Sequence, residues 1–372
     1  MKILHINSYY GGGMFYKHLY DRQKDQGVEI DVYVPVSNAV NLSNVNLGDY
    51  TTVSTNHSKY DRFFFHIKHH KIVKDVKNKY DIRDYDMVHA HSLFSNGYIA
   101  WKLKKEFGIP YMVAIRNTDV NYFFKYMIHL RKLGVEILKE ADNIICLSES
   151  YKNTVMETCV PEHLTCEISR KVEIVPNGID DFWFKNRSHY KESPSKDDLK
   201  LMYAGVVNKR KNVLTTTKAI ELLIQRGYQV TFTVVGRMED PTIGQTLKSM
   251  PFVQYIEPKQ KEELINIYRD HDIFVMPSIS ETFGLVYPEA MSQGLPVIYS
   301  QGQGFDGQFD EGVVGYSVTS TSAEEVADAI EGILNNYEVL STNCVEKVDQ
   351  FHWNKISEDY FNLYTQIMEQ NK

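Results

Sequence analysis

The sequence predicts an α/β fold with two Rossmann-like, doubly wound domains that face a cleft, and three observations support this class. Short apolar, β-branched segments alternate with longer polar segments along the 372 residues, which is the pattern of parallel strands joined by helices. The chain is longer than one hydrophobic core usually fills and suits two domains of ordinary size. A polar segment that contains a proline, residues 186–200, interrupts the alternation and predicts a linker.

Each series of apolar segments predicts one sheet. We expect the strands of the first sheet at Lys2–Ile6, Val28–Val34, Asp86–Ala90, Tyr111–Ile115, Asn143–Leu147 and Val172–Val175. Those of the second sheet are expected at Lys200–Ala204, Gln229–Val235, Val253–Ile256, Ile273–Met276, Val297–Tyr299 and Gly315–Val318. The expected domains are therefore residues 1–185 and residues 198–353.

The composition excludes several classes of protein. With 43% hydrophobic and 24% charged residues, the chain is globular rather than disordered. No run of about 18 apolar residues occurs, so no transmembrane helix is expected. The first 13 residues lack the apolar stretch of a signal peptide, which predicts a cytoplasmic protein. The cysteines have neither metal-ligand nor disulfide spacing and are expected to stay reduced: Cys146, Cys159, Cys166 and Cys344.

Charge is unevenly distributed along the chain. The net charge of −7 argues against general binding to nucleic acid, yet residues 66–80 contain five lysines and one aspartate. Aromatic residues precede this segment at 62–65 and recur with basic residues at 121–134. Two interpretations are open: peripheral contact with an anionic surface at the inner face of the cell membrane, or core aromatics beside a solvated basic face. The histidines at 66–70 and the pair at 89 and 91 do not predict a metal site.

The segment SETFGLVYPEAMSQGLPVI, residues 280–298, carries the strongest functional signal. Glu281 and Glu289 are eight residues apart, too far to face each other along one helix that rises about 1.5 Å per residue. Gly284 and Pro288 instead predict a loop that runs into a short helix, with Glu281 before the helix and Glu289 on it. The segment lies between two expected strands, at the edge of a parallel sheet where such folds bind ligands.

This arrangement suits an elongated ligand with a phosphate at its centre and hydroxyl groups at both ends, such as a nucleotide sugar. The backbone N–H groups of Phe283, Gly284 and Leu285 are expected to be free to bind phosphate. Either glutamate can accept hydrogen bonds from a pair of hydroxyls. The competing interpretation is two solvated charges that flank a helix.

Two other segments bear on a phosphate site. Lys209, Arg210 and Lys211 follow the expected strand that ends at Gly205. Cations at this edge of a sheet can neutralise a diphosphate, although an isolated cluster of this kind is more often a solvated turn. Gly11–Gly13 follow the first strand but do not match the dinucleotide fingerprint, so a nicotinamide cofactor is not expected.

These residues resemble the retaining glycosyltransferases of family four, the glycosyl transferases group 1, which have the GT-B fold. The resemblance covers nearly the whole chain and rests on VPNGID (175–180), Gly205 with KRKN (209–212), VVGR (234–237), residues 262–298 and FHWNKISEDYFNLY (351–364). The long central match, whose two glutamates form an E-x7-E motif, is highly specific. The resemblance implies that a last helix, residues 354–372, crosses back onto the first domain and that the second domain binds a nucleotide-sugar donor.

The resemblance also implies roles for single residues. Glu281 would contact the donor sugar and Glu289 the ribose, while Arg210 and Lys211 would bind the diphosphate. The other residues expected around the donor are Gly12, Gly13, Gly205, Gly236, Arg237, Ile256, Thr282, Phe283, Gly284 and Leu285.

The chain departs from the family pattern at two places. Val206 stands where many members carry Arg, so the phosphate charge is expected to fall to Arg210 and Lys211. Arg116 and Asn117, before Asp119, stand where many members carry a His-Gly pair. Because a guanidinium binds anions and cannot act as a base, an acidic sugar or an acceptor phosphate is a hypothesis here. The candidate catalytic residues are Glu281, Arg210, Lys211, Asp119 and Arg116.

The resemblance therefore implies a retaining, metal-independent transferase whose first domain, residues 1–185, binds the acceptor. It would move a hexose-type sugar from a nucleotide diphosphate sugar, expected to be a UDP-sugar, to a glycan or lipid-linked saccharide in bacterial surface polysaccharide synthesis. We expect no cofactor besides this donor substrate, no bound metal and no nucleic-acid partner. The alternatives are a sugar phosphorylase or a nucleotide-sugar epimerase on the same scaffold, or a non-catalytic nucleotide-sugar-binding subunit.

Overall fold

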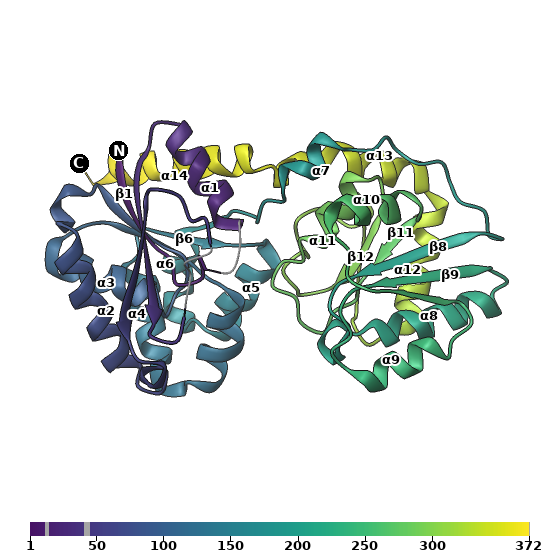
Figure 1. Cartoon of the computed structure of the whole chain (residues 1–372), viewed down its shortest axis with the longest axis horizontal. Helices are drawn as coiled ribbons and strands as arrows, with labels where there is room; N and C mark the ends of the chain where they lie inside the picture. The colour runs from purple at the N-terminus through teal and green to yellow at the C-terminus, as the bar shows by residue number, and fades with distance from the viewer. Residues whose placement is uncertain (12–14, 41–44, 372) are drawn as a thin grey trace. The chain divides into compact units, whose positions relative to one another are not determined.

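The computed structural model describes residues 1–11, 15–40 and 45–371, and it divides the chain into two compact units (Figure 1). Unit 1 comprises residues 1–147, 152–178 and the chain from Trp353 onward. Unit 2 comprises residues 148–151 and 179–352. The segment 186–200, expected to be a linker, belongs to unit 2, where Nζ of Lys191 donates hydrogen bonds to the carbonyls of Tyr268 (3.1 Å) and Arg269 (2.7 Å).

Unit 1 contains a seven-stranded sheet in the order β3-β2-β1-β4-β5-β6-β7, and all its neighbouring strands are parallel. The strands are β1 (Lys2–Ile6), β2 (Glu29–Ser37), β3 (Thr51–His57), β4 (Met87–Ala90), β5 (Tyr111–Ala114), β6 (Asn143–Cys146) and β7 (Val172–Ile174). Every strand that the sequence predicts for this sheet is confirmed. The edge strand β3 was missed, because its sequence TTVSTNH has a single aliphatic residue.

Helices cover both faces of this sheet. They are α1 (Phe15–Asp25), α2 (Phe65–Lys79), α3 (Gly97–Phe107), α4 (Arg131–Glu140), α6 (Glu162–Ser169) and α14 (Trp353–Gln370), while α5 (Glu149–Thr158) begins in unit 2 and continues in unit 1. One hydrophobic core joins α1 and α14 to the sheet, and α2, α3 and α4 pack together on the opposite face (Figure 1).

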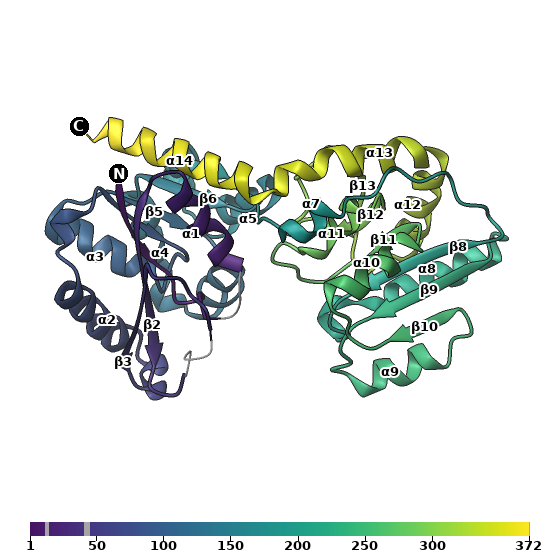
Figure 2. The same cartoon turned by 45° about the horizontal axis from the view of Figure 1, so that its top comes forward.

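The last helix closes unit 1 by packing against the first one, as both views show (Figures 1 and 2). Its buried side chains recur at the spacing of one helix face: Trp353, Ile356, Tyr360, Leu363, Tyr364 and Ile367. The buried hydroxyl of Tyr364 accepts a hydrogen bond from Nε2 of Gln23 on α1 (2.9 Å) and lies 2.7 Å from Nδ1 of His89 on β4. These two contacts connect α1 and α14, which come from opposite ends of the chain, to β4 at the centre of the sheet.

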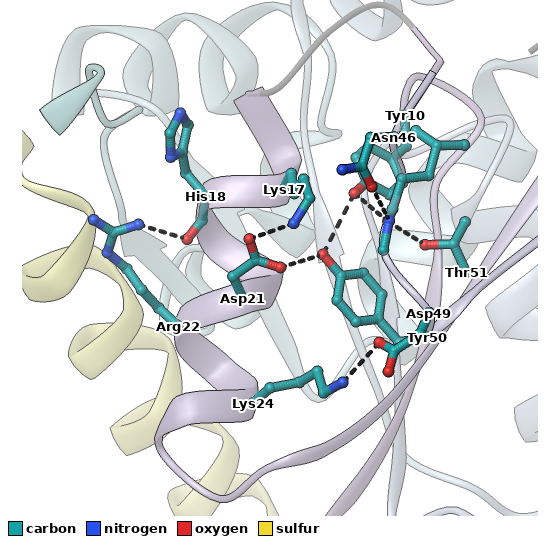
Figure 3. A network of polar contacts seen from close by, with 12 residues as sticks. Tyr10, Lys17, His18, Asp21, Arg22, Lys24, Asn46, Asp49, Tyr50 and Thr51 are labelled. Atoms are coloured by element: carbon teal, nitrogen blue, oxygen red, sulfur yellow. Dashed lines mark hydrogen bonds and ion pairs between the residues drawn. The ribbon is translucent and has the colours of Figure 1, made fainter. Parts of the chain in front are cut away.

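Polar contacts hold α1 against the segment before β3 (Figure 3). The hydroxyl of Tyr50 donates to Oδ1 of Asp21 (2.8 Å), and Asp21 is also paired with Lys17 (2.6 Å). The hydroxyl of Tyr10 donates to the carbonyl of Leu47 (2.6 Å). These bonds fix Tyr10 at the carboxyl end of β1, the edge of the sheet where ligands of this fold class bind.

Unit 2 contains a six-stranded parallel sheet in the order β10-β9-β8-β11-β12-β13. Its strands, all predicted from the sequence, are β8 (Leu199–Ala204), β9 (Val230–Val235), β10 (Val253–Ile256), β11 (Ile273–Val275), β12 (Val297–Ser300) and β13 (Gly315–Val318). Its helices are α7 (Asp181–Lys185), α8 (Val213–Gln225), α9 (Pro241–Lys248), α10 (Lys261–Arg269), α11 (Val286–Ser292), α12 (Ala323–Asn335) and α13 (Tyr337–Lys347). Within the described residues, no helix combines the length and apolar character that crossing a membrane requires.

We predict that Tyr364→Phe lowers the free energy of unfolding by about 1–3 kcal/mol, because the buried side chains of His89 and Gln23 lose their shared partner. Urea unfolding monitored by circular dichroism measures this loss. The matched control is Tyr126→Phe, since Tyr126 is 65% exposed. A loss no larger than that of the control would show that the hydroxyl does not stabilise unit 1.

Candidate functional site

The order of strands in unit 2 reverses between β8 and β11, which are neighbours in the sheet although β9 and β10 separate them in the sequence. Loops that leave the carboxyl ends of two such strands diverge, and ligands of doubly wound folds bind in the crevice between them. The loop after β8 carries Lys209–Lys211, and the loop after β11 carries residues 279–285. The structure therefore brings together the two segments that the sequence analysis selected.

Direct contacts join these two loops. Nζ of Lys211 forms an ion pair with Oε2 of Glu281, and the two side chains are only 13% and 9% exposed. Nη1 of Arg210 donates to the carbonyl of Ser280 (2.8 Å), and the N–H of Ile279 donates to the carbonyl of Arg210 (2.9 Å). The ion pair supplies a cation that can bind phosphate beside a carboxylate that can accept hydrogen bonds from hydroxyls.

The loop between Glu281 and α11 has the predicted form. Glu281 precedes the helix and Glu289 lies on it, and Pro288 lies in its first turn. Gly284 has φ of +82°, and a Cβ there would lie 2.4 Å from the ring of Tyr287, so only glycine fits. Among the described residues, the N–H groups of Phe283, Gly284 and Leu285 have no hydrogen-bond partner. The side chain of Phe283 is buried, which leaves only its backbone for a ligand.

Glu289 lies in a polar and aromatic environment that the sequence did not reveal. Burial is the largest cause that raises its pKa to about 8, and the nearby Asp180 adds to this rise. The nearby polar groups of Trp183 and Tyr268 and the charge of Lys261 oppose this rise of the pKa. Nζ of Lys261 is itself paired with Asp180 at 2.6 Å. At neutral pH the carboxyl of Glu289 is therefore mostly protonated and can both donate to and accept from a pair of hydroxyls.

The other residues of unit 2 that are expected to contact the donor lie at or beside the carboxyl ends of β8 and β9. A Cβ on Gly236 would lie 1.8 Å from the carbonyl oxygen of Gly205, so the close approach of these strands requires glycine. The N–H of Gly236 donates to the carbonyl of Ile256 (3.0 Å). Arg237 is exposed and paired with Glu239 at 2.5 Å. The structure thus brings Gly205, Gly236 and Ile256 together through the backbone.

The catalytic role predicted for Asp119 stays a prediction, because its side chain is fully buried in the free protein. Its carboxylate is fully buried and accepts hydrogen bonds from the N–H groups of Leu93 (3.0 Å), Phe94 (3.1 Å) and Arg116 (2.8 Å). Both carboxylate oxygens therefore bind backbone N–H groups. Through these bonds Asp119 joins the loops after β4 and β5 of unit 1.

Arg116 lies in unit 1, half-buried, and its side chain makes two long hydrogen bonds. Nε donates to the carbonyl of His91 (3.3 Å), and Nη1 donates to Oδ1 of Asn177 (3.4 Å). A guanidinium has five N–H donors and binds anions, and the catalytic role of Arg116 stays a prediction. Gly12 and Gly13, expected beneath the donor, lie outside the described residues.

The fully buried histidines of unit 1, His5, His89 and His91, have nitrogen atoms within 4.8 Å of one another. Their rings do not converge on one point: those of His89 and His91 stack at 4.0 Å with an angle of 22° between planes. A metal binds along the in-plane lone pair of each imidazole, so stacked rings cannot both face one ion. Burial lowers the pKa of all three rings, to about 3 for His5. They form a neutral, hydrogen-bonded part of the core.

Comparison of the sequence with known protein families gives matches along most of the chain. The model of the family described as glycosyl transferases group 1 matches residues 184–350, and that of glycosyltransferase family 4 matches residues 9–181. A D-inositol 3-phosphate glycosyltransferase of Actinosynnema mirum is 26% identical over 312 residues, which cover 77% of this chain and 73% of the relative.

Two solved structures share the fold. Sucrose-phosphate synthase from Thermosynechococcus elongatus is 19% identical, with a TM-score of 0.74 and 100% of both chains covered. HepE of Anabaena, solved in complex with UDP, is 17% identical, with a TM-score of 0.73, and the match covers 98% of this chain and 100% of HepE.

We predict that Glu289→Gln reduces the loss of stability at alkaline pH. Since the pKa of Glu289 rises from 4.5 to about 8 on folding, the folded state holds a proton that the unfolded state lacks between these values, and the free energy of unfolding falls as pH rises through this window. The variant has no such group, so it should lose about 4 kcal/mol less than the natural protein between pH 5 and pH 8.5. Urea unfolding at both pH values measures the difference, and equal losses would contradict it.

Proposed function

The chain belongs to family four of the glycosyltransferases, with the GT-B fold, and we propose that it moves a hexose-type sugar from a UDP-sugar to a saccharide acceptor. The observation that carries this proposal is the buried ion pair of Lys211 and Glu281 at the strand-order reversal of unit 2. It places a phosphate-binding cation beside a hydroxyl-binding carboxylate. The complex of HepE with UDP supports the choice of base.

Each group around the donor has one task in this proposal. Lys211 and Arg210 neutralise the diphosphate, together with the free N–H groups of residues 283–285. Glu281 accepts hydrogen bonds from the sugar, and the protonated carboxyl of Glu289 binds the ribose hydroxyls. Cationic side chains thus stabilise the leaving group, so the reaction needs neither a metal nor another cofactor.

The proposed chemistry is transfer with retention of configuration. The bond between C1 of the sugar and the diphosphate oxygen breaks, while a bond from C1 to the acceptor hydroxyl oxygen forms on the same face. The acceptor proton passes to the departing diphosphate oxygen. No side chain forms a covalent bond to the sugar, and the cations hold the diphosphate where it can take that proton.

We further propose that the acceptor is a glycan or lipid-linked saccharide of a bacterial surface polysaccharide, used at the cytoplasmic face of the membrane. Two segments of unit 1 expose large apolar side chains next to basic residues. The exposed side chains are Tyr60, Phe63, Phe64 and Ile67 near the start of α2, and Tyr122, Tyr126 and Ile128 before α4. Exposed aromatic and basic residues together favour an anionic membrane surface. Other aromatics of these segments, such as Phe65 and Phe124, are core residues.

The donor site predicts a selective effect of two neighbouring lysines. Lys211→Met is expected to weaken binding of UDP-glucose by about tenfold or more, because one charge-assisted hydrogen bond to phosphate is lost. Lys209→Met is the matched control, since Lys209 is exposed and lines a separate cavity beside Asp240. Calorimetry with UDP-, GDP-, ADP- and CMP-sugars, with EDTA present, measures the affinities.

Equal losses in both variants would mean that general charge, and not the ion pair at the strand-order reversal, binds the donor. Absence of binding to any nucleotide sugar would reject the transferase and favour a sugar phosphorylase, which releases sugar 1-phosphate from a glycan. Conversion of the donor without an acceptor would indicate an epimerase. Tight binding without turnover on any acceptor would indicate a non-catalytic subunit.

The exposed aromatics predict membrane binding. Replacing Phe63 and Phe64 by serine is expected to reduce binding to phosphatidylglycerol vesicles by about tenfold, because two exposed rings no longer enter the bilayer interface. Val339→Ser in unit 2 is the control, since Val339 is 61% exposed. Vesicle sedimentation measures the bound fraction. If the natural protein stays in the supernatant, the membrane contact is rejected while the donor site is unaffected.

A further inference from the structure

Unit 1 has a cavity at the place where the order of its own strands reverses. This cavity is not part of the donor site in unit 2. The order reverses between β1 and β4, and the cavity of about 500 Å³ lies where loops leave the carboxyl ends of these strands. Tyr9 follows β1, Ser95 follows β4, Thr118 follows β5, and Lys68 and His69 come from α2. A second cavity of about 520 Å³ shares Tyr9, Lys68, His69 and Ser95, so the two are adjacent.

Lys68 is a half-buried cation. Its ammonium group has no hydrogen-bond or ion-pair partner among the described residues, and burial lowers its pKa. The acidic side chain that acts on it is Asp61, which is already paired with Lys71 at 2.7 Å. A partly desolvated charge without a partner is costly. An anionic ligand in the cavity would remove this cost.

His69 offers the complementary group. Its side chain is 2% exposed, and Nδ1 lies 2.7 Å from the carbonyl oxygen of Phe65. Because a carbonyl oxygen only accepts, Nδ1 carries the proton. Burial lowers the pKa of the ring to about 3, so the ring is neutral and Nε2 presents a lone pair. Within the described chain Nε2 has no partner, and a hydroxyl group of a ligand would supply one.

The rest of the lining suits a sugar. Ser95 and Thr118 contribute hydroxyls, and the rings of Tyr9, Tyr122 and Phe123 contribute flat apolar surfaces that can cover the face of a pyranose. Besides Lys68, Arg62 is a lining residue with a positive charge, and no acidic residue lines the cavity among the described residues. The cavity therefore combines positive charge, a hydrogen-bond acceptor and aromatic surface.

We propose that this cavity binds an acceptor sugar that carries an anionic group, with the anion on Lys68 and a hydroxyl on Nε2 of His69. This inference rests on the proposed transferase function and specifies the class of its acceptor. The anion can be a phosphate or a carboxylate, because a lysine ammonium binds either as a point charge.

The test measures binding of three hexoses to the full chain by calorimetry: D-glucose 6-phosphate, D-glucuronate and uncharged D-glucose. The natural protein should bind one or both anionic sugars at least about tenfold more tightly than glucose, the gain from one charge-assisted hydrogen bond. Lys68→Gln should abolish this preference, and Lys68→Arg should retain it. Lys74→Gln is the matched control, because Lys74 is an exposed residue of the same helix that does not line the cavity.

Tighter binding of the phosphate or of the carboxylate identifies the anion. Equal affinity for all three sugars, no binding, or an unchanged preference in Lys68→Gln would overturn the inference. UDP-glucose is titrated into the same samples. If it fails to bind the natural protein, the transferase proposal fails, whereas the preference for anionic sugars is a separate result. Lys68→Gln should bind UDP-glucose like the natural protein, since Lys68 belongs to unit 1 and the donor residues to unit 2.

Discussion

The candidate site depends on one constraint of a parallel sheet: all strands end at the same edge, and loops diverge where the order of strands reverses. In unit 2 this places the loops after β8 and β11 side by side, although Lys211 and Glu281 are 70 residues apart in the sequence. The close approach of Gly236 to the carbonyl oxygen of Gly205 excludes any side chain at the neighbouring strand ends. The polar groups of the candidate site therefore lie next to strand ends, whose positions are fixed by the sheet.

Removal from water determines the charge state of each ionisable group at these sheet edges and how much the group gains from an ion of opposite charge. Lys211 and Glu281 neutralise each other, so a donor must share an existing ion pair and gains less than the full attraction of a bare cation. Glu289 has no ion-pair partner among the described residues, and burial raises its pKa to about 8. Lys68 has no partner among the described residues. Lys68 has the least compensated charge of these groups, so it should gain the most free energy from binding an anionic ligand.

The sequence predicts the sheets well because buried parallel strands are continuous apolar runs, as in FVM at 274–276 and VIYS at 297–300. It also predicts that Glu281 precedes a short helix and that Glu289 lies on it, since Gly284 and Pro288 are local signals. It does not predict the surroundings of Glu289, because Asp180 and Lys261 meet only through the fold. The polar edge strand β3 has too little apolar character to stand out.

Asp119 shows that the fold gives a predicted site residue structural contacts that the sequence does not reveal. A carboxylate after a strand of the sheet is well placed for catalysis, but the same position exposes unpaired backbone N–H groups of the neighbouring loop. In this chain Asp119 accepts from two of them, those of Leu93 and Phe94, and from the N–H of Arg116, which it holds at the edge of the sheet. Its pKa still rises to about 6, because burial outweighs these hydrogen bonds. The charge available to a substrate near β5 is therefore the positive charge of Arg116, which is consistent with an anionic acceptor in unit 1.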